Sequence, residues 1–192
     1  MTQQIALFPL NAVLFPGGLL PLRIFEPRYV DMVGRCLRTD AAFGVVLVDG
    51  GSDTEREVST ALIGTSARIV DFQTLDDGLL GLLCRGERRF RIRSRERQDD
   101  GLNCASVEWL EPERVVAVAA HFQPLVPLLR QAMASLTTIG RFIEPNYEDA
   151  SWVSHRLAEL LPLDQRLQQH LLELEDPEAR LRLLAPLIDV QT

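Results

Sequence analysis

Short runs of apolar residues, many alternating with polar ones, fill the chain up to about Pro112. A period of two is typical of strands that bury one face, and glycine- or aspartate-containing turns separate several of the runs. Asp77-Gly78 and Asp100-Gly101 are the clearest turn signals, and they predict two-residue hairpins of type I′. The pattern predicts seven strands, which are Ile5–Phe8, Leu19–Phe25, Phe43–Val48, Ala61–Gln73, Leu79–Arg85, Arg88–Arg97 and Leu102–Leu110.

Apolar residues at helical spacing occur in one place among these strands and then throughout the rest of the chain. Pro27 suits the first position of the early helix, whose apolar stripe runs to Leu37. Beyond Pro112 the spacing predicts about four helices, with Asp149 as an N-cap and Pro177 at the first position of the last one. The expected fold class is therefore α+β. A β-rich pseudo-barrel or sandwich with one helix over residues 1–112 precedes a helical bundle over residues 113–192.

A proline-punctuated apolar segment near the N-terminus has the most unusual pattern in the chain. Prolines at positions 9, 16, 21 and 27 and the pair Gly17-Gly18 interrupt a stretch of large apolar residues. Proline lacks a backbone donor, so neither a continuous strand nor a continuous helix can form here. The segment reads Pro9-Leu10, Val13-Leu14-Phe15-Pro16-Gly17, Leu20-Pro21-Leu22 and Ile24-Phe25-Glu26-Pro27-Arg28-Tyr29.

This segment resembles the opening of the substrate-binding N-terminal domain of Lon-type ATP-dependent proteases. A second block near the C-terminus is similar to the last two helices of that family. Its order and spacing fit without a gap, so the resemblance covers the whole chain. The residues of the second block are Leu161-Pro162-Leu163, Gln169, Leu172-Glu173, Asp176 and Arg180-Leu181.

The resemblance implies a domain that helps to select and hold polypeptide substrates and supports oligomerisation. In full-length Lon proteases, an ATPase module and a serine–lysine protease module follow this domain. The present sequence is too short for either, and we expect a stand-alone domain without them. All twenty basic residues are arginine, so neither a serine–lysine dyad nor the lysine of a phosphate-binding loop is present. We therefore expect a non-enzymatic chain.

The proline-punctuated segment supplies the first candidate binding residues. Leu20, Leu22 and Ile24 alternate like a core-facing strand, and packing in the core is the competing interpretation for most of the segment. Glu26 is expected either to cap the following helix or to pair with Arg28. The candidate contacts for a peptide or protein partner are Phe15, Leu20, Pro21, Arg23, Phe25, Arg28 and Tyr29.

A run of arginines supplies the second candidate. Arginines at alternate positions share one face of a strand, and such a face can receive an acidic partner. A solvated face neutralised by its neighbours is the competing interpretation. If Asp100-Gly101 is a two-residue turn, Arg93 lies opposite Glu108, and that pair adds at most about 1 kcal/mol. The residues are Arg89, Arg91, Arg93, Arg95 and Arg97.

Composition and residue spacing limit the partners, cofactors and catalytic groups that we expect. The net charge of −7 argues against nucleic acid as a partner. No run is long enough to span a membrane, and no signal peptide is visible, so we expect a cytoplasmic protein. The three cysteines and three histidines show no metal-ligand spacing, so we expect no metal and no cofactor. Ser151 and His155 share a helix, but no motif accompanies them and we assign no catalytic residue.

Three functions are consistent with these observations. The favoured one is a protein-binding module that engages unfolded or damaged polypeptide. A regulatory module that binds a specific partner or a small ligand, in a cleft between barrel and bundle, is the alternative. An orphan hydrolase is the lesser alternative. Whether the chain forms homo-oligomers stays open at this stage.

Overall fold

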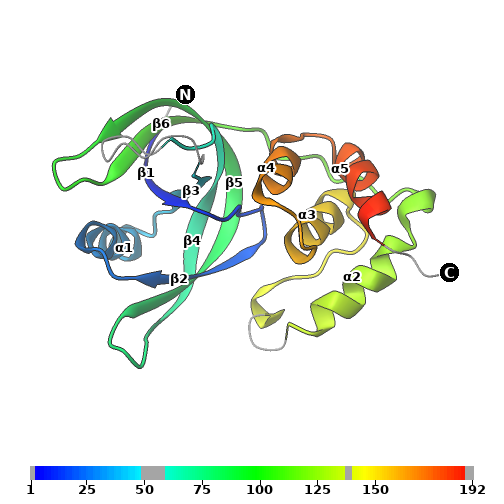
Figure 1. The fold of residues 1–192 in the computed structure, drawn as a ribbon, viewed down its shortest axis with the longest axis horizontal. Helices are drawn as coiled ribbons and strands as arrows, with labels where there is room; N and C mark the ends of the chain where they lie inside the picture. Colours follow the sequence, from blue (N-terminus) through cyan, green and yellow to red (C-terminus); the bar gives the residue numbers. More distant parts are fainter. Residues whose placement is uncertain (1–2, 49–58, 137–139, 189–192) are drawn as a thin grey trace. The chain divides into compact units, whose positions relative to one another are not determined.

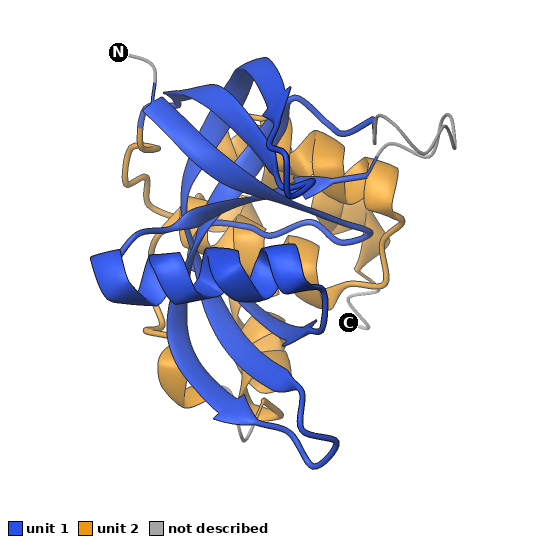
Figure 2. Ribbon diagram, turned by 90° about the vertical axis from the view of Figure 1, so that its left-hand side faces the viewer, with its two compact units in different colours: residues 1–111 blue, residues 112–192 orange. Residues whose placement is uncertain are grey.

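The computed structural model describes residues 3–48, 59–136 and 140–188 and divides the chain into two compact units, residues 1–111 and 112–192. Figure 2 distinguishes the units by colour. We had predicted the boundary between the β-rich and the helical parts one residue later, after Pro112. The first unit holds all the strands and one helix of the described chain, and the second holds helices (Figure 1). The fold is therefore α+β, as predicted.

The first unit is built on a six-stranded sheet with the order β2-β5-β4-β3-β1-β6. Because β6 also pairs with β5, five of the strands close a ring. The sixth strand, β2, pairs with residues 80–85 of β5, whereas β6 pairs with residues 90–97. All pairs are antiparallel except β1 with β3. The elements are β1 (Gln3–Leu10), β2 (Leu19–Ile24), α1 (Pro27–Thr39), β3 (Phe43–Leu47), β4 (Ile63–Thr74), β5 (Leu80–Arg97) and β6 (Asn103–Trp109).

Two of the seven predicted strands are one continuous strand, β5. We had predicted one strand that ends at Arg85 and another that begins at Arg88. Here Gly86 continues the pairing with β4, opposite Ala67. Its missing side chain also allows another backbone to approach, since a Cβ on Gly86 would lie 2.2 Å from the Phe15 carbonyl oxygen.

Both predicted hairpin turns are present, but their type differs from the prediction. A type I′ turn requires positive φ at both central residues. Only Gly78 and Gly101 have positive φ, at 82° and 81°, and neither preceding aspartate does. Backbone hydrogen bonds between Leu75 and Leu79, and between Gln98 and Leu102, each enclose a three-residue loop. The loops are therefore of the kind that ends on a glycine in the left-handed region.

Two apolar clusters form the core of the first unit. One lies between α1 and the sheet and includes Tyr29, Met32, Val33 and Cys36 of the helix. The other centres on the ring of Phe90, and a Cβ on Gly64 would lie 2.8 Å from that ring. Leu20, Leu22 and Ile24 of β2 belong to the first cluster, which confirms the predicted core-facing side of that strand.

The second unit contains α2 (Leu125–Ala134), α3 (Ala150–Leu160), α4 (Gln165–Glu173) and α5 (Pro177–Leu184). Asp149 caps α3 as predicted, since its Oδ1 accepts a hydrogen bond from the Ser151 backbone N–H at 3.1 Å. Pro177 stands at the start of α5, also as predicted. The α4 helix begins at Gln165, because the Asp164 side chain takes the N-cap position. Among the described residues, none of the helices has the length and apolar character that crossing a bilayer requires.

Candidate functional site

The connection from β2 to α1 carries the most exposed aromatic ring among the described residues. Phe25 follows the last residue of β2, and 67% of it is exposed. Pro27 comes two residues later and starts the helix, because its fixed φ suits the first helical position. Phe25 is therefore held between two regular elements.

An ion pair fixes the backbone directly after Phe25. Glu26 is the N-cap residue of α1, but its side chain makes no capping hydrogen bond and instead pairs with Arg28. Arg28 Nη1 also donates to the carbonyl of Gly101, at 3.2 Å, and thus ties the helix to the β5–β6 turn. Of the two predicted roles for Glu26, the structure shows the ion pair.

Tyr29 belongs to the core. Its ring lies 4.2 Å from the ring of Phe8, measured between centroids, and 8% of the residue is exposed. Burial raises the pKa of the Tyr29 hydroxyl, and the neighbouring Arg28 guanidinium partly offsets that rise. Arg28 and Tyr29 therefore hold the start of α1 in place.

Phe15 is fully buried, with an exposed fraction of 0%. The backbone around it runs against Gly86, where Gly17 N–H donates to the Gly86 carbonyl and Gly86 N–H donates to Gly18. Phe15 was one of the residues we expected at the surface, but this close approach turns its ring inward. Leu20 is half-buried and packs on the α1 cluster, so neither residue contributes an open contact surface.

Pro21 and Arg23 are exposed on β2, the edge strand of the sheet. The two residues are two positions apart and so share one face of the strand. Arg23 pairs with Asp77 in the β4–β5 turn. Pro21 has no N–H to offer, and it fits this strand because its nitrogen can face away from β5. Of the candidate contact residues, Pro21, Arg23 and Phe25 are thus the exposed ones.

The arginines of β5 do not share one exposed face, so that prediction was wrong. A bulge between Ile92 and Ser94 shifts the register against β6 and reverses which side chains face outward. Arg89, before the bulge, is 5% exposed. Arg91 is half-buried, whereas Arg93 in the bulge and Arg95 and Arg97 beyond it are exposed.

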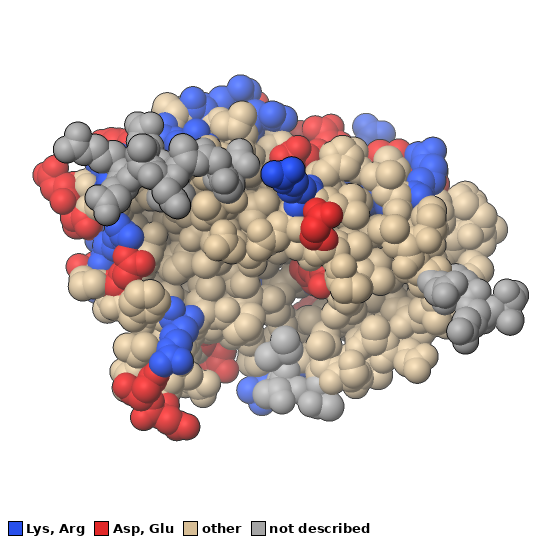
Figure 3. Space-filling view, viewed as in Figure 1, with Lys and Arg blue, Asp and Glu red and all other residues tan. Residues whose placement is uncertain are grey.

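Neighbouring groups engage the exposed arginines. Arg93 Nε donates to Glu108 Oε2 at 2.7 Å, which is the predicted ion pair, although the residue directly opposite Glu108 is Arg91. Arg95 donates to the Thr60 carbonyl at 2.8 Å. Basic and acidic side chains are interspersed on the face that Figure 3 shows, with wide uncharged areas between them. The geometry favours the neutralised-face interpretation of this strand.

The family model for the ATP-dependent protease La (LON) substrate-binding domain matches residues 4–190. The chain belongs to this Lon domain family. Its match to the Lon protease of Cytophaga hutchinsonii has 25% identity and covers 93% of this chain but 23% of the protease. The chain thus spans about a quarter of the length of the curated Lon proteases that it matches.

Two solved structures of Lon N-terminal domains have the same fold. The Lon N-terminal domain protein from Xanthomonas campestris is 37% identical, with a TM-score of 0.80, over 96% of this chain and 98% of that one. The N-terminal domain of the Mycobacterium avium complex Lon protease is 16% identical, with a TM-score of 0.65, over 99% and 100%. The second likeness concerns the fold alone.

The C-terminal block of this Lon domain holds a buried ionic network. Arg180 Nη1 donates to Glu113 Oε1 at 2.9 Å, and Arg180 Nε donates to Ser154 Oγ at 3.0 Å. The Arg180 side chain is 0% exposed and that of Glu113 is 8% exposed. The network joins α3 and α5 to the segment that precedes α2. Arg180 in the C-terminal block therefore has a structural role as the buried centre of this network.

The same network accounts for Ser151 and His155. Ser151 Oγ donates to Glu113 Oε2 at 2.5 Å. A hydroxyl has one hydrogen to donate, so this proton points to a carboxylate and not to the imidazole. His155 Nε2 lies 3.6 Å from Glu113 Oε1. The Glu113 carboxylate is itself ion-paired with Arg180, which makes it a weak base, and the arrangement supports the start of α3.

Metal and thiol chemistry find little support in the described part of this Lon domain. Residues 3–48, 59–136 and 140–188 contain no group of three or more metal-ligating side chains suited to an ion. Cys36, Cys84 and Cys104 are free thiols in the α1 cluster. Burial raises the pKa of Cys84 to about 12, so this thiol stays protonated and unreactive at neutral pH.

Sequence reasoning overlooked one surface of this Lon domain, the outward side of α2. We had used only its apolar stripe, and the stripe is where Leu125 and Leu129 are buried. Five residues on other sides of the helix, together with Gln123 just before it, line a pocket that contains Arg130. The sequence did contain a signal for this surface, because the lining residues form two rows at a spacing of four.

Proposed function

We propose that this chain is a non-catalytic module that binds unfolded or damaged polypeptide through the surface around Phe25. The observation that carries the proposal is the 67% exposure of Phe25 at a position where Pro27 and the Glu26–Arg28 pair hold the backbone. The family description, a substrate-binding domain, supports it. Pro27, two residues after Phe25, is exposed as well, and exposed apolar patches mark interaction sites.

The physical basis of selectivity is the exposure of apolar side chains in unfolded chains. A folded protein keeps its large apolar residues inside, whereas an unfolded one offers them to a ring such as Phe25. Full burial of a phenylalanine side chain contributes about 1.5–3 kcal/mol. Ordering the bound segment offsets part of this gain, so we expect affinities of roughly micromolar or weaker.

Pairing of a substrate strand with β2 contributes less than side-chain contacts. Among the described strands β2 pairs only with β5, so its outer edge is open for strand addition in principle. Pro21 sits in the middle of that edge and cannot donate a hydrogen bond. A substrate strand would meet an interrupted ladder there, and Phe25 therefore carries the recognition.

Fluorescence anisotropy with a labelled, permanently unfolded protein tests the proposal. A reduced and carboxymethylated protein serves as the probe, and its native form serves as the folded control. We expect saturable binding of the unfolded form only. Replacing Phe25 by alanine should weaken binding by roughly 5-fold or more, because burial of the ring is lost.

A matched variant locates the site. Phe72 lies on β4 and is 58% exposed, so Phe72→Ala removes a ring of similar exposure elsewhere. Selective loss in Phe25→Ala supports the proposed surface. Equal loss in both variants would mean that any exposed ring suffices, and the absence of binding at about 100 μM protein would contradict the function itself.

The non-catalytic part of the proposal is tested separately. Purified chain is incubated with casein, with and without ATP, and the products are analysed by gel. We expect intact casein, because the chain contains no lysine for a dyad and Ser151 donates its proton to Glu113. Cleavage that Ser151→Ala abolishes would overturn this part and favour the hydrolase alternative.

We also propose where in the cell the chain works and what its self-association would add. We place the chain in a reducing cytoplasm, because its three cysteines are free and buried. Self-association would add a second binding surface and so raise the avidity for a long unfolded chain. Sedimentation velocity measures it directly.

A further inference from the structure

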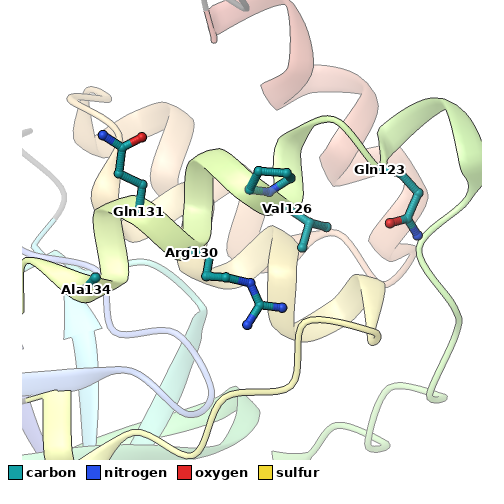
Figure 4. A pocket seen from close by; sticks show the side chains of 6 residues that line it. Gln123, Val126, Arg130, Gln131 and Ala134 are labelled. Carbon is teal, nitrogen blue, oxygen red and sulfur yellow. The ribbon is translucent and has the colours of Figure 1, made fainter.

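A shallow groove, largely open to solvent, runs along the exposed side of α2 in the second unit. Its volume is about 570 Å³. The lining residues form two rows at a spacing of four, and residues so spaced lie on one side of a helix. Figure 4 shows both rows, with Arg130 and Gln131 pointing to different sides. The rows are Gln123, Pro127 and Gln131, and Val126, Arg130 and Ala134.

Arg130 is the charged group of this groove, and its guanidinium is held in place. Its Cζ lies 3.9 Å from the centroid of the Tyr147 ring. Tyr147 in turn meets Trp152 edge to face, with centroids 5.0 Å apart. A guanidinium stacked on a ring keeps its in-plane N–H donors free for a carboxylate. The stack thus prepares Arg130 for bidentate recognition.

Among the residues that the structure describes, none is an acidic partner of Arg130. Several other arginines of the second unit have one, because Arg156 pairs with Glu159, Arg180 with Glu113, and Arg182 with Asp176. For Arg130 the described part of the chain offers the Tyr147 ring and no carboxylate. A positioned cation without a counter-ion, in a groove with apolar and amide walls, is complementary to a ligand that brings a carboxylate.

The dimensions of the groove suggest the form of that ligand. From Gln123 to Ala134 the helix advances about 16 Å, at about 1.5 Å per residue. An extended chain covers this length with about five residues. Gln123 and Gln131, one at each end of a row, carry amides that can bond to the backbone of such a segment. Val126 and Pro127 offer apolar contact between them.

We propose that the outward side of α2 binds an extended, acidic segment of polypeptide, with Arg130 pairing to its central carboxylate. Tyr147 acts as a positioning residue for Arg130. The inference does not rest on the proposed function, because it concerns a surface of the second unit, whereas Phe25 belongs to the first. A polyphosphate chain such as nucleic acid fits less well, since the groove offers one cation in a protein of net charge −7.

Anisotropy titrations of the full chain with two labelled five-residue peptides test the proposal. Both peptides alternate leucine and serine, and they differ only in a central glutamate or glutamine. We expect the glutamate peptide to bind about 2- to 5-fold more tightly, which is the range for an exposed ion pair. Arg130→Gln should remove this preference and leave binding of the glutamine peptide unchanged.

Matched variants separate a specific pair from general charge. Arg166 is exposed on α4, so Arg166→Gln makes the same change in charge elsewhere and should keep the preference. Tyr147→Phe keeps the stack and should also keep it, whereas Tyr147→Ala should reduce it. Ala134→Glu places a carboxylate one turn from Arg130 and should weaken binding of the glutamate peptide by competition. Thermal melts verify that each variant is folded.

Several outcomes would overturn the proposal. These are equal affinity for the two peptides, a preference that survives Arg130→Gln, a preference that Arg166→Gln also removes, and no binding of either peptide at about 1 mM. Tighter, Arg130-dependent binding of a single-stranded oligonucleotide would overturn it in favour of nucleic acid. Phe25→Ala should leave the glutamate preference unchanged, which keeps this result distinguishable from failure of the unfolded-chain proposal.

Discussion

At the scale of single residues, the two ion pairs with the clearest geometry have opposite environments. Arg180 and Glu113 are buried, and they share their remaining hydrogen bonds with Ser151 and Ser154. Arg93 and Glu108 are each about half exposed, with side-chain exposures of 54% and 46%. Water screens and competes for the second pair but not for the first. The same removal of charge should therefore have very different consequences at the two sites.

Glu113→Gln should lower the free energy of unfolding by about 3–5 kcal/mol, because it leaves the buried Arg180 cation without its counter-ion. Glu108→Gln is the matched control and should cost less than about 1 kcal/mol. Urea unfolding followed by circular dichroism measures both. Similar costs for the two variants would show that the buried network does not hold the second unit together.

At the scale of elements, the sequence located both hairpins but not their geometry. Each turn has the same chemistry, two aspartates followed by glycine, and the second aspartate accepts a hydrogen bond two residues ahead, Asp77 from Leu79 and Asp100 from Leu102. That bond competes with the type I′ geometry we expected from the last two residues alone. The β5 bulge was similarly invisible, because it depends on the pairing with β6 and not on a local signal.

The two turn glycines permit an element-scale test. Gly78→Ala should cost about 1 kcal/mol, since φ is 82° and nothing lies within 4 Å of the added Cβ. Gly101→Ala should cost more, because its Cβ would also lie 3.2 Å from Arg28 Nη1 and disturb the bond from Arg28 to the turn. Thermal unfolding of both variants measures the difference. Equal costs would mean that the Arg28 tie contributes nothing to stability.

At the scale of the whole molecule, the fold could be predicted better than the site. Periodicity and two motif blocks were enough for the fold class, because they report local preference and overall pattern. Exposure of a particular ring depends on distant packing. Phe15 and Phe25 look alike in the sequence, yet the backbone of Gly86 turns the first inward, while Pro27 leaves the second in solvent. Arg130 was missed for a related reason, since its stack on Tyr147 joins separate segments.

Buried thiol and tyrosine hydroxyl groups make the stability of the first unit fall at alkaline pH. Burial raises the pKa of Cys36, Cys104 and Tyr29, and that of Cys84 from 9.0 to about 12. Above pH 9 the unfolded chain releases protons that the folded chain keeps, so the unfolded state is favoured. The contribution is fully present below pH 9 and is lost as the pH rises toward 12.

The free energy of unfolding should therefore decline steadily as the pH rises above 9. Cys84→Ala removes one of these protons, and its decline between pH 9.5 and 10.5 should be shallower by about 1.4 kcal/mol per pH unit. Urea titrations at pH 8, 9.5 and 10.5, on wild type and variant, give the two slopes. A variant that is merely less stable by a constant amount at every pH would show that Cys84 ionises normally in the folded chain, contrary to its burial in the α1 cluster.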